Sequence, residues 1–228
     1  MLCSFIGTHG SGKTTLLSRL RTEVIHNSSW ISISELTRQC PHRIGEESDN
    51  LAQEWIIATQ DYLESNSLLL GFPVLSDRAL IDQYAYYQYW VGKNESIERR
   101  IIERYSKNDY FYKLPANPDF LKTDGIRPIS IDFQRIIDEI LETTIQRLKL
   151  HQITNIYEVN PLKDNISNVI LDILSGKTER ILLEPPVAQY EYSQDFFQKV
   201  LMFNNVKPNY FEAVIDLQFK HWLQEYSW

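Results

Sequence analysis

An eight-residue run near the start of the chain constrains the fold more than any other feature. It reads Gly7-Thr8-His9-Gly10-Ser11-Gly12-Lys13-Thr14 and fits the phosphate-binding pattern G-x-x-x-x-G-K-S/T. An apolar segment at 2–6, typical of a buried strand, precedes the run, and apolar Leu16, Leu17 and Leu20 indicate a helix after it. A strand, a glycine-rich turn and a helix start together form a cradle of backbone N–H groups for a polyphosphate. We therefore expect the chain to bind a nucleoside triphosphate, with contacts from Gly7, His9, Gly10, Ser11, Gly12, Lys13, Thr14 and Thr15.

Strand and helix signals alternate along the next 150 residues, which is the pattern of an α/β protein with a parallel sheet. Polar stretches at 38–48 and 115–128 indicate loops. Five strands are predicted, at 2–6, 30–33, 72–76, 110–114 and 155–159. Helices are predicted from residue 15 and at 49–65, 79–91, 94–106, 130–149 and 164–174.

Composition excludes several classes of protein. A net charge of −7 and a pI near 5.3 argue against a broad nucleic-acid footprint. No run approaches the roughly 18 apolar residues of a membrane span, and no charged region precedes a signal-type stretch. The two cysteines, Cys3 and Cys40, give neither metal-ligand spacing nor a disulfide framework. A cytoplasmic protein without membrane or nucleic-acid partners is expected.

A second polar pair, Asp77-Arg78, directly follows the apolar strand predicted at 72–76. Ligands of open α/β sheets bind outside the carboxyl ends of the strands. An acid there can hold a magnesium ion together with the hydroxyl of Thr14. The planar guanidinium of Arg78 matches phosphate oxygens. The alternative is a surface ion pair that merely ends a strand.

Glu35 and Arg38 follow the second predicted strand at the same sheet edge. Three residues apart, they would share one face of a helical turn. We expect them to bind an acceptor, with Glu35 as general base for an acceptor hydroxyl. A solvated turn with an ordinary ion pair is the alternative.

The loop at 115–128 is long for a plain connection and contains an Asp-Gly turn signal. Lids of phosphoryl-transfer enzymes bring cations onto the transferring group. Arg127 is the first candidate for that role and Lys122 the second, and a mobile surface loop is the alternative.

These motifs together resemble the NadR-type kinase-like AAA group of P-loop proteins, and the stretch Val74 to Tyr86 is also similar to the Asp-Arg segment of thymidylate kinases. The resemblance covers about residues 1–175. It implies a P-loop NTPase of the nucleotide-kinase type: α/β, with a doubly wound parallel five-stranded sheet and helices on both faces. The residues that it implies for ATP and Mg²⁺ are Lys13, Thr14 and Asp77. Those that it implies for phosphate or acceptor contacts are Arg38, Arg78 and Arg127, with Tyr84 on the acceptor side.

Residues 177–228 differ in composition from the P-loop kinase-like domain expected at 1–176. Eleven of these 52 residues are aromatic, and five Lys or Arg balance seven Asp or Glu. Helical spacing within 196–203 and 210–222 predicts a mainly helical extension. So much aromatic surface packs on the core, on a second subunit in a homodimer, or on a partner.

The hypothesis that unites these features is an ATP- and Mg²⁺-dependent small-molecule kinase. Its acceptor would be a nucleoside or nucleotide, first a deoxynucleoside monophosphate such as dTMP, then ribosylnicotinamide, then a modified base in DNA. The competing hypothesis is a regulatory ATPase that switches its hold on a protein partner. A GTPase is disfavoured because no N/T-K-x-D motif follows a predicted strand.

Overall fold

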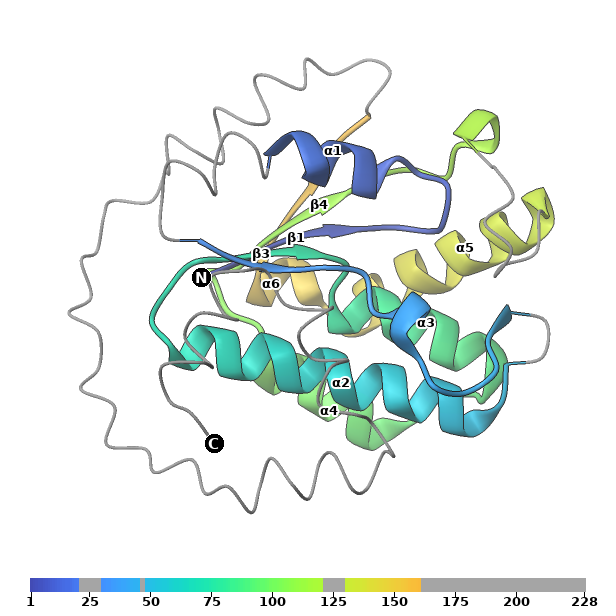
Figure 1. The fold of residues 1–228 in the computed structure, drawn as a ribbon, viewed down its shortest axis with the longest axis horizontal. Coiled ribbons are helices and arrows are strands. Elements are labelled where there is room, and N and C mark those ends of the chain that lie inside the picture. The colour runs from blue at the N-terminus through green and yellow to red at the C-terminus, as the bar shows by residue number, and fades with distance from the viewer. Residues whose placement is uncertain (21–29, 46–47, 121–129, 161–228) are drawn as a thin grey trace.

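Five parallel strands form the centre of the molecule (Figure 1). The computed structural model describes residues 1–20, 30–45, 48–120 and 130–160. The strands are β1 (Leu2–Ile6), β2 (Ile31–Ile33), β3 (Val74–Asp77), β4 (Tyr110–Lys113) and β5 (Asn155–Glu158), in the spatial order β2-β3-β1-β4-β5. This order places β1 in the middle, so the turn that follows it opens at the centre of the carboxyl edge.

The register of the strands brings the second polar pair to that same place. Phe5 of β1 pairs with Asp77 of β3, and Ile6 of β1 pairs with Lys113 of β4. The turn after β1 and the residues after β3 are therefore neighbours in space, although about seventy positions separate them in the sequence.

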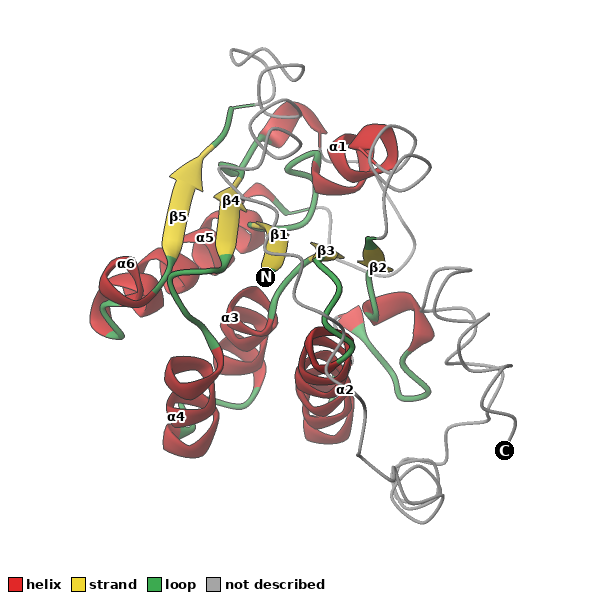
Figure 2. Ribbon diagram, turned by 90° about the vertical axis from the view of Figure 1, so that its left-hand side faces the viewer, coloured by secondary structure: helices red, strands yellow, loops and turns green. Residues whose placement is uncertain are grey.

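Helices cover both faces of the sheet (Figure 2). On one face lies α1 (Lys13–Leu20), which packs Leu16, Leu17 and Leu20 against Phe5, Leu75 and Tyr112. On the other face lie α2 (Asn50–Leu69), α3 (Leu80–Trp90) and α5 (Ile131–Arg147), which bury the larger apolar cluster of the described residues. The helices α4 (Glu95–Arg104) and α6 (Leu150–Ile153) complete that side.

Side-chain caps begin three of these helices and explain where they start. Asp49 accepts the N–H of Ala52 at 2.7 Å at the start of α2, and Ser130 accepts that of Phe133 at 3.1 Å at the start of α5. Asn94 accepts two N–H groups at the start of α4. Short polar side chains satisfy N–H groups that a helix leaves without a partner.

The predicted fold class is confirmed in the described residues, with small differences at the element boundaries. Strand β3 begins at Val74 rather than at Phe72, and α2 continues past Ser65 to Leu69. The loop predicted at 38–48 opens with a 3₁₀ turn, η2 (Thr37–Gln39), and that at 115–128 with η4 (Pro118–Phe120). The helix predicted at 164–174, the extension 177–228, and Lys122 and Arg127 of the expected lid lie outside the described residues. No helix in the described ranges is long and apolar enough to cross a membrane.

Candidate active site

The turn between β1 and α1 has the backbone geometry of a phosphate-binding loop. Gly7, Gly10 and Gly12 have φ values of 134°, 68° and 93°, which residues with a side chain rarely adopt. A Cβ added to Gly7 would lie 2.5 Å from the carbonyl oxygen of Leu114, so glycine is required there for close packing as well. Helix α1 begins directly at Lys13 and aims its N-terminal N–H groups at the turn.

The side chain of Lys13 folds back over this loop. Its Nζ donates to the carbonyl oxygens of Gly7, at 2.8 Å, and Thr8, and to Ser11 Oγ at 3.1 Å. The residue is 4% exposed. A nucleotide phosphate would have to take Lys13 Nζ from these oxygens, so the loop is held closed by contacts that a ligand can replace.

Thr14 and Asp77 are brought together as the sequence predicts for a metal site. Thr14 Oγ1 donates to Asp77 Oδ2 at 2.7 Å, and Asp77 Oδ1 is buried without a hydrogen-bond partner among the described residues. Hydroxyl and carboxylate oxygens are the hard ligands that Mg²⁺ prefers, and Mg²⁺ takes its remaining ligands from water and substrate phosphates. The described residues contain no group of three or more His, Cys, Asp or Glu side chains that could hold a metal ion. The pair therefore fits Mg²⁺.

Arg78 lies at the centre of the site and is 1% exposed. Its Nε donates to Glu35 Oε1 at 3.0 Å, and its Nη1 donates to Asp82 Oδ2 at 3.0 Å and to the Gly7 carbonyl oxygen at 3.4 Å. The guanidinium carbon lies 5.1 Å from the centre of the Tyr86 ring, within cation–π distance. The positive charge of Arg78 is thus compensated by two carboxylates, and its planar group joins the phosphate loop to α3.

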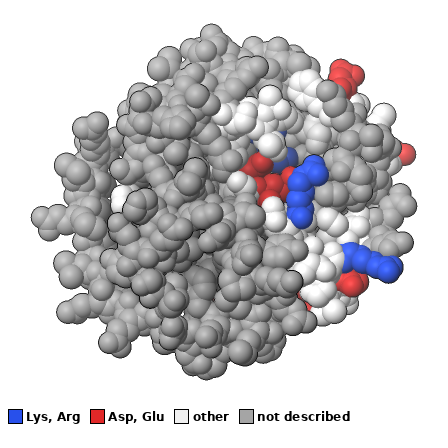
Figure 3. All heavy atoms as spheres, in the orientation of Figure 1, with Lys and Arg blue, Asp and Glu red and all other residues white. Residues whose placement is uncertain are grey.

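Acidic groups outnumber basic ones in this cluster. Arg78, Asp82, Asp77 and Glu35 all act electrostatically on Lys13. Burial, and then the charge of Arg78, lowers the pKa of Lys13 to about 7, while the three carboxylates oppose this shift. Burial, and then the charge of Glu35, raises the pKa of Asp77. Figure 3 shows acidic and basic side chains gathered side by side on the described part of the surface. The three carboxylates exceed the two cations by one charge, which favours a bound cation over a further anion.

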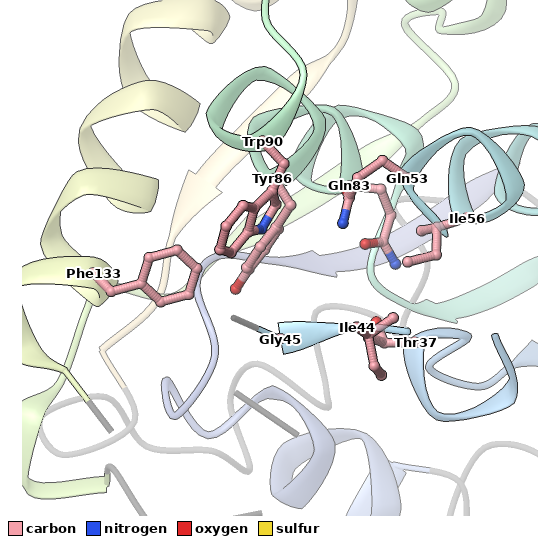
Figure 4. Close-up of a pocket in the computed structure, with 9 residues that line it drawn as sticks. All are labelled: Thr37, Ile44, Gly45, Gln53, Ile56, Gln83, Tyr86, Trp90 and Phe133. Carbon is pink, nitrogen blue, oxygen red and sulfur yellow. The ribbon is translucent and has the colours of Figure 1, made fainter. Parts of the chain in front are cut away.

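A pocket opens beside the Arg78 cluster (Figure 4). Aromatic rings of α3 and α5 form one side, and α2 with the segment after β2 forms the other. The cavity volume is about 30 Å³, which is room for roughly two water molecules. The lining residues are Thr37, Ile44, Gly45, Gln53, Ile56, Gln83, Tyr86, Trp90 and Phe133.

Two amide side chains of this pocket have unmet hydrogen-bonding capacity. Gln53 donates through Nε2 to Ser48 Oγ at 2.7 Å, while its Oε1 is buried and has no partner in the described chain. Gln83 Nε2 is likewise buried without a partner there. Buried polar atoms are nearly always hydrogen-bonded in folded proteins. An acceptor and a donor left unmet in one aromatic pocket point to a planar polar ligand.

Tyr86 connects the pocket to the phosphate loop. Its hydroxyl accepts the backbone N–H of His9 at 2.9 Å and lies 3.2 Å from His9 Nδ1. The His9 ring packs against Phe133, with ring centres 5.2 Å apart. On the other side, Gln134 of α5 donates to the His9 carbonyl oxygen at 2.8 Å. A ligand in the pocket and a phosphate on the loop would therefore meet at His9 and Tyr86.

Tyr84, expected on the acceptor side, does not line this pocket. Its hydroxyl accepts the N–H of Asn94 at 2.8 Å and donates to Glu98 Oε1 at 2.7 Å, so it joins α3 to α4. Gln83, Tyr86 and Trp90 instead share the face of α3 that lines the pocket. Residue 84 lies on another face.

Glu35 and Arg38 do not share one face of a helical turn. The 3₁₀ turn begins only at Thr37, after Glu35, and Arg38 on that turn is exposed. The Glu35 side chain, 14% exposed, is directed to Arg78 instead. Thr15 is exposed on α1.

Sequence reasoning missed most of the pocket. The sequence pattern places four residues in or beside it only within predicted helices: Gln53, Tyr86, Phe133 and Gln134. The polar and aromatic positions 83, 86 and 90, spaced as one helix face directly after Asp77-Arg78, were a signal for α3. Nothing in the sequence places α5 beside them.

Comparison with known proteins agrees with this geometry. A family model described as an AAA domain matches residues 2–157. Deoxyadenosine kinase from M. mycoides, solved with dCMP and dCDP, is similar in fold with a TM-score of 0.54 and 13% identity, over 77% of this chain and 97% of that one. Thymidylate kinase from Candida albicans is similar with a TM-score of 0.51 and 18% identity, over 76% of this chain and 89% of that one.

At these identities the two kinases establish the fold alone. No curated protein matches the sequence significantly. The family match spans more than half of the chain and includes the phosphate loop, Asp77 and every described strand except the last residue of β5. The expected kinase-like AAA group is thereby confirmed, and the chain belongs to the AAA-domain family of P-loop proteins.

Proposed function

We propose that the protein is an ATP- and Mg²⁺-dependent kinase that transfers the γ-phosphoryl group to a nucleoside or nucleotide. The observation that carries this proposal is the position of the Glu35–Arg78 pair. Arg78 contacts Gly7 of the phosphate loop and the ring of Tyr86 in the pocket wall, so Glu35 lies between the two binding regions. Phosphoryl-transfer enzymes use a residue in such a place to orient or deprotonate the nucleophile.

Each residue of the cluster has a role in this reaction. The loop N–H groups and Lys13 bind the β- and γ-phosphates once Lys13 leaves the carbonyl oxygens of Gly7 and Thr8. Thr14 and Asp77 hold Mg²⁺, which when bound neutralises charge on the phosphate oxygens. Arg78 orients Glu35, and Glu35 removes the proton from the acceptor. Arg127, outside the described residues, stays a predicted cation for the transferring group.

The pocket favours an acceptor with a flat, polar ring. Tyr86, Trp90 and Phe133 offer ring faces and edges, and Gln53 and Gln83 offer an acceptor and a donor to the rim of a ring. A nucleobase carries both kinds of group on its edge. At about 30 Å³ the cavity must widen to admit one, which side-chain rotation or movement of the Ile44–Gly45 segment would allow.

The charges favour a hydroxyl over a phosphate as the accepting group. Arg78 is compensated by Glu35 and Asp82, and an acceptor phosphate beside Glu35 would meet a like charge. A hydroxyl gains from a nearby carboxylate, because it must lose its proton during transfer. We infer that nucleosides are preferred to monophosphates such as dTMP, with ribosylnicotinamide among the candidates.

A substrate panel tests the proposal. The full-length protein is incubated with ATP, Mg²⁺ and each of the common nucleosides, deoxynucleosides, their monophosphates and ribosylnicotinamide, and the phosphorylated product is identified by mass spectrometry. We expect product from at least one nucleoside-class acceptor and none without Mg²⁺. Steady ATP hydrolysis with no phosphorylated acceptor would refute the kinase proposal and favour a regulatory ATPase that binds a protein partner.

A further inference from the structure

The backbone of Arg78 has an unusual conformation that something must maintain. Its φ is 91°, and among the described residues only Lys149 is another non-glycine residue with positive φ. This region is sparsely populated by residues with a side chain and persists where the surroundings impose it. Because Nε of Arg78 bonds to Glu35, the conformation of this turn sets where the Glu35 carboxylate lies.

Polar side chains from outside the site hold the turn in this conformation. The Arg78 N–H continues the sheet by donating to the Phe5 carbonyl oxygen at 3.1 Å. Past that point, Gln60 Nε2 of α2 donates to the Arg78 carbonyl oxygen at 3.4 Å, and Glu64 Oε1 accepts the Leu80 N–H at 2.8 Å. Gln60 Nε2 also donates to Glu64 Oε1 at 2.9 Å, so the two side chains act as one unit.

Glu64 is poorly compensated for a buried carboxyl group. Gln60 and Glu64 are both fully buried. The nearest cation, Arg104 at the end of α4, places Nε 4.0 Å from Glu64 Oε2. Neither that oxygen nor Arg104 Nε and Nη2 has a hydrogen-bond partner among the described residues. A buried carboxyl group with such weak pairing costs stability relative to an apolar side chain, so core packing does not explain its presence.

We propose that Gln60 and Glu64 of α2 are positioning residues for phosphoryl transfer, and that the charge on Glu64 determines how firmly the Arg78–Leu80 turn holds Arg78 and Glu35. The expected effect on the rate of transfer rests on the proposed function, whereas the effect on the Arg78–Leu80 turn does not. Neither residue lines the pocket or contacts the phosphate loop, and both act through the backbone of the turn.

The ionised carboxylate is the form that holds the turn. A hydrogen bond from an N–H group to a charged carboxylate is shorter and stronger than one to a neutral carboxyl group. Burial raises the pKa of Glu64 to about 7, while Arg104 and the bonds from Gln60 and Leu80 oppose the rise. As pH falls through this range, Glu64 gains a proton, its hold on the Leu80 N–H weakens, and transfer should slow.

Other ionisable groups face Glu64 and belong to this pH dependence. Asp61 on α2 raises the pKa of Glu64 as a like charge. Tyr105, which follows α4, is uncharged at neutral pH because burial raises its pKa well above the ordinary value. Its hydroxyl accepts the Ile81 N–H. Asp82 of α3 accepts the Ala79 N–H, and its negative charge raises the pKa of Tyr105. Burial raises the pKa of Asp82 as well, so the assignment of the titration to Glu64 rests on the Glu64→Gln variant.

The kinetic test compares Glu64→Gln with Glu54→Gln, the same change on the exposed face of α2. With an acceptor identified by the panel, we expect Glu64→Gln to lower kcat about 10- to 100-fold, as small misplacements of reacting groups do, with KM for ATP unchanged. The acid limb of the wild-type kcat profile near pH 7 should be absent from the variant, and Glu54→Gln should keep it. Wild-type kcat and an intact acid limb in Glu64→Gln would overturn the proposal.

A second variant and a second measurement separate positioning from stability. Arg104→Gln removes the charge that favours ionised Glu64, so the acid limb should move to higher pH, whereas a purely structural role predicts no shift. In the free protein, the backbone amide signals of Arg78 and Leu80 in ¹⁵N NMR should titrate together near pH 7 and stop doing so in Glu64→Gln. Amide signals that do not titrate would overturn the proposal even if the panel yields no acceptor, and titrating amides without an acceptor would refute only the kinase.

Discussion

The phosphate loop and the acceptor pocket differ in how their polar atoms are satisfied. In the loop, Lys13 Nζ binds the carbonyl oxygens of Gly7 and Thr8 and Ser11 Oγ, and the N–H of His9 donates to Tyr86. In the pocket, Gln53 Oε1 and Gln83 Nε2 are buried without partners in the described residues. The Lys13 cation of the loop is already bonded within the described chain, whereas these two amide atoms of the pocket are not.

This difference indicates how each region responds to its ligand. A phosphate oxygen must replace the carbonyl oxygens that Lys13 Nζ now binds, so the net gain from that hydrogen bond is small and charge carries most of it. A ring in the pocket instead satisfies atoms that are already desolvated, so each of its hydrogen bonds adds specificity. Tyr86 contacts the loop and lines the pocket, so binding of one ligand affects binding of the other through this residue.

The largest effect is expected from Lys13→Ala. The loop keeps its glycine geometry and the Ser11 Oγ bond to Thr8, so the fold should remain, as judged by circular dichroism and thermal melting. Transfer should fall about 100- to 1,000-fold or more, because removing one preorganised donor from a developing charge costs that much. Lys107→Ala, which removes a surface contact to the His151 carbonyl oxygen, is the matched control. Near wild-type turnover in Lys13→Ala would remove the basis for the kinase.

A somewhat smaller loss is expected from Glu35→Gln. The amide oxygen can still accept from Arg78 Nε, so the position of the guanidinium is kept while the base is removed. General-base catalysis contributes about 100- to 10,000-fold, and kcat should fall toward the lower end of that range while KM for ATP stays constant. Glu139→Gln, which neutralises an exposed carboxylate 3.7 Å from Arg135 Nε, should leave kcat unchanged. If Glu35→Gln raises the acceptor KM and spares kcat, Glu35 binds the acceptor and does not deprotonate it.

The same contrast explains how much the sequence could predict. The phosphate loop and the strand ending in Asp77-Arg78 are contiguous patterns, and their neighbourhood follows from a parallel sheet whose carboxyl ends meet. The pocket combines Gln53, Gln83 and Phe133 from three helices, and their approach depends on tertiary packing that no local pattern encodes. Helix phase separates Tyr84 from the pocket-lining Tyr86, because a shift of two residues moves a side chain to another face. The pairing of Arg78 with Glu35 was equally invisible, since it needs the distance between two loops. The pairing with Asp82 spans only four residues.

An intermediate effect is expected from Gln83→Leu. Losing one hydrogen bond to a bound ring costs about 1 kcal/mol or somewhat more, so the acceptor KM should rise roughly 5- to 20-fold with kcat less affected. Stability should not fall, because the change removes a buried donor that has no partner in the described chain. Gln88→Leu on the same helix, where Nε2 donates to Thr144 Oγ1 at 2.8 Å, is the control, and it should lower stability without changing KM. An unchanged acceptor KM in Gln83→Leu would show that the ring of the acceptor does not bind beside Gln83.

The smallest effect is proton uptake on nucleotide binding, which should distinguish the loop from the pocket. Burial and Arg78 lower the pKa of Lys13 to about 7, and bound phosphate anions, being opposite charges, should raise it again. Below pH 7 Lys13 already carries its proton, so uptake should be near zero, and above pH 7 it should grow toward one proton per nucleotide. Calorimetry of ADP–Mg²⁺ binding at pH 6 and pH 8, in buffers of different ionisation enthalpy, measures this uptake, and Lys13→Ala gives the part due to the nucleotide itself. Acceptor binding should take up no proton, since none of the pocket-lining side chains titrates in this range. Equal uptake in wild type and Lys13→Ala would show that Lys13 is fully protonated in the closed loop and that its contacts to carbonyl oxygens outweigh its burial.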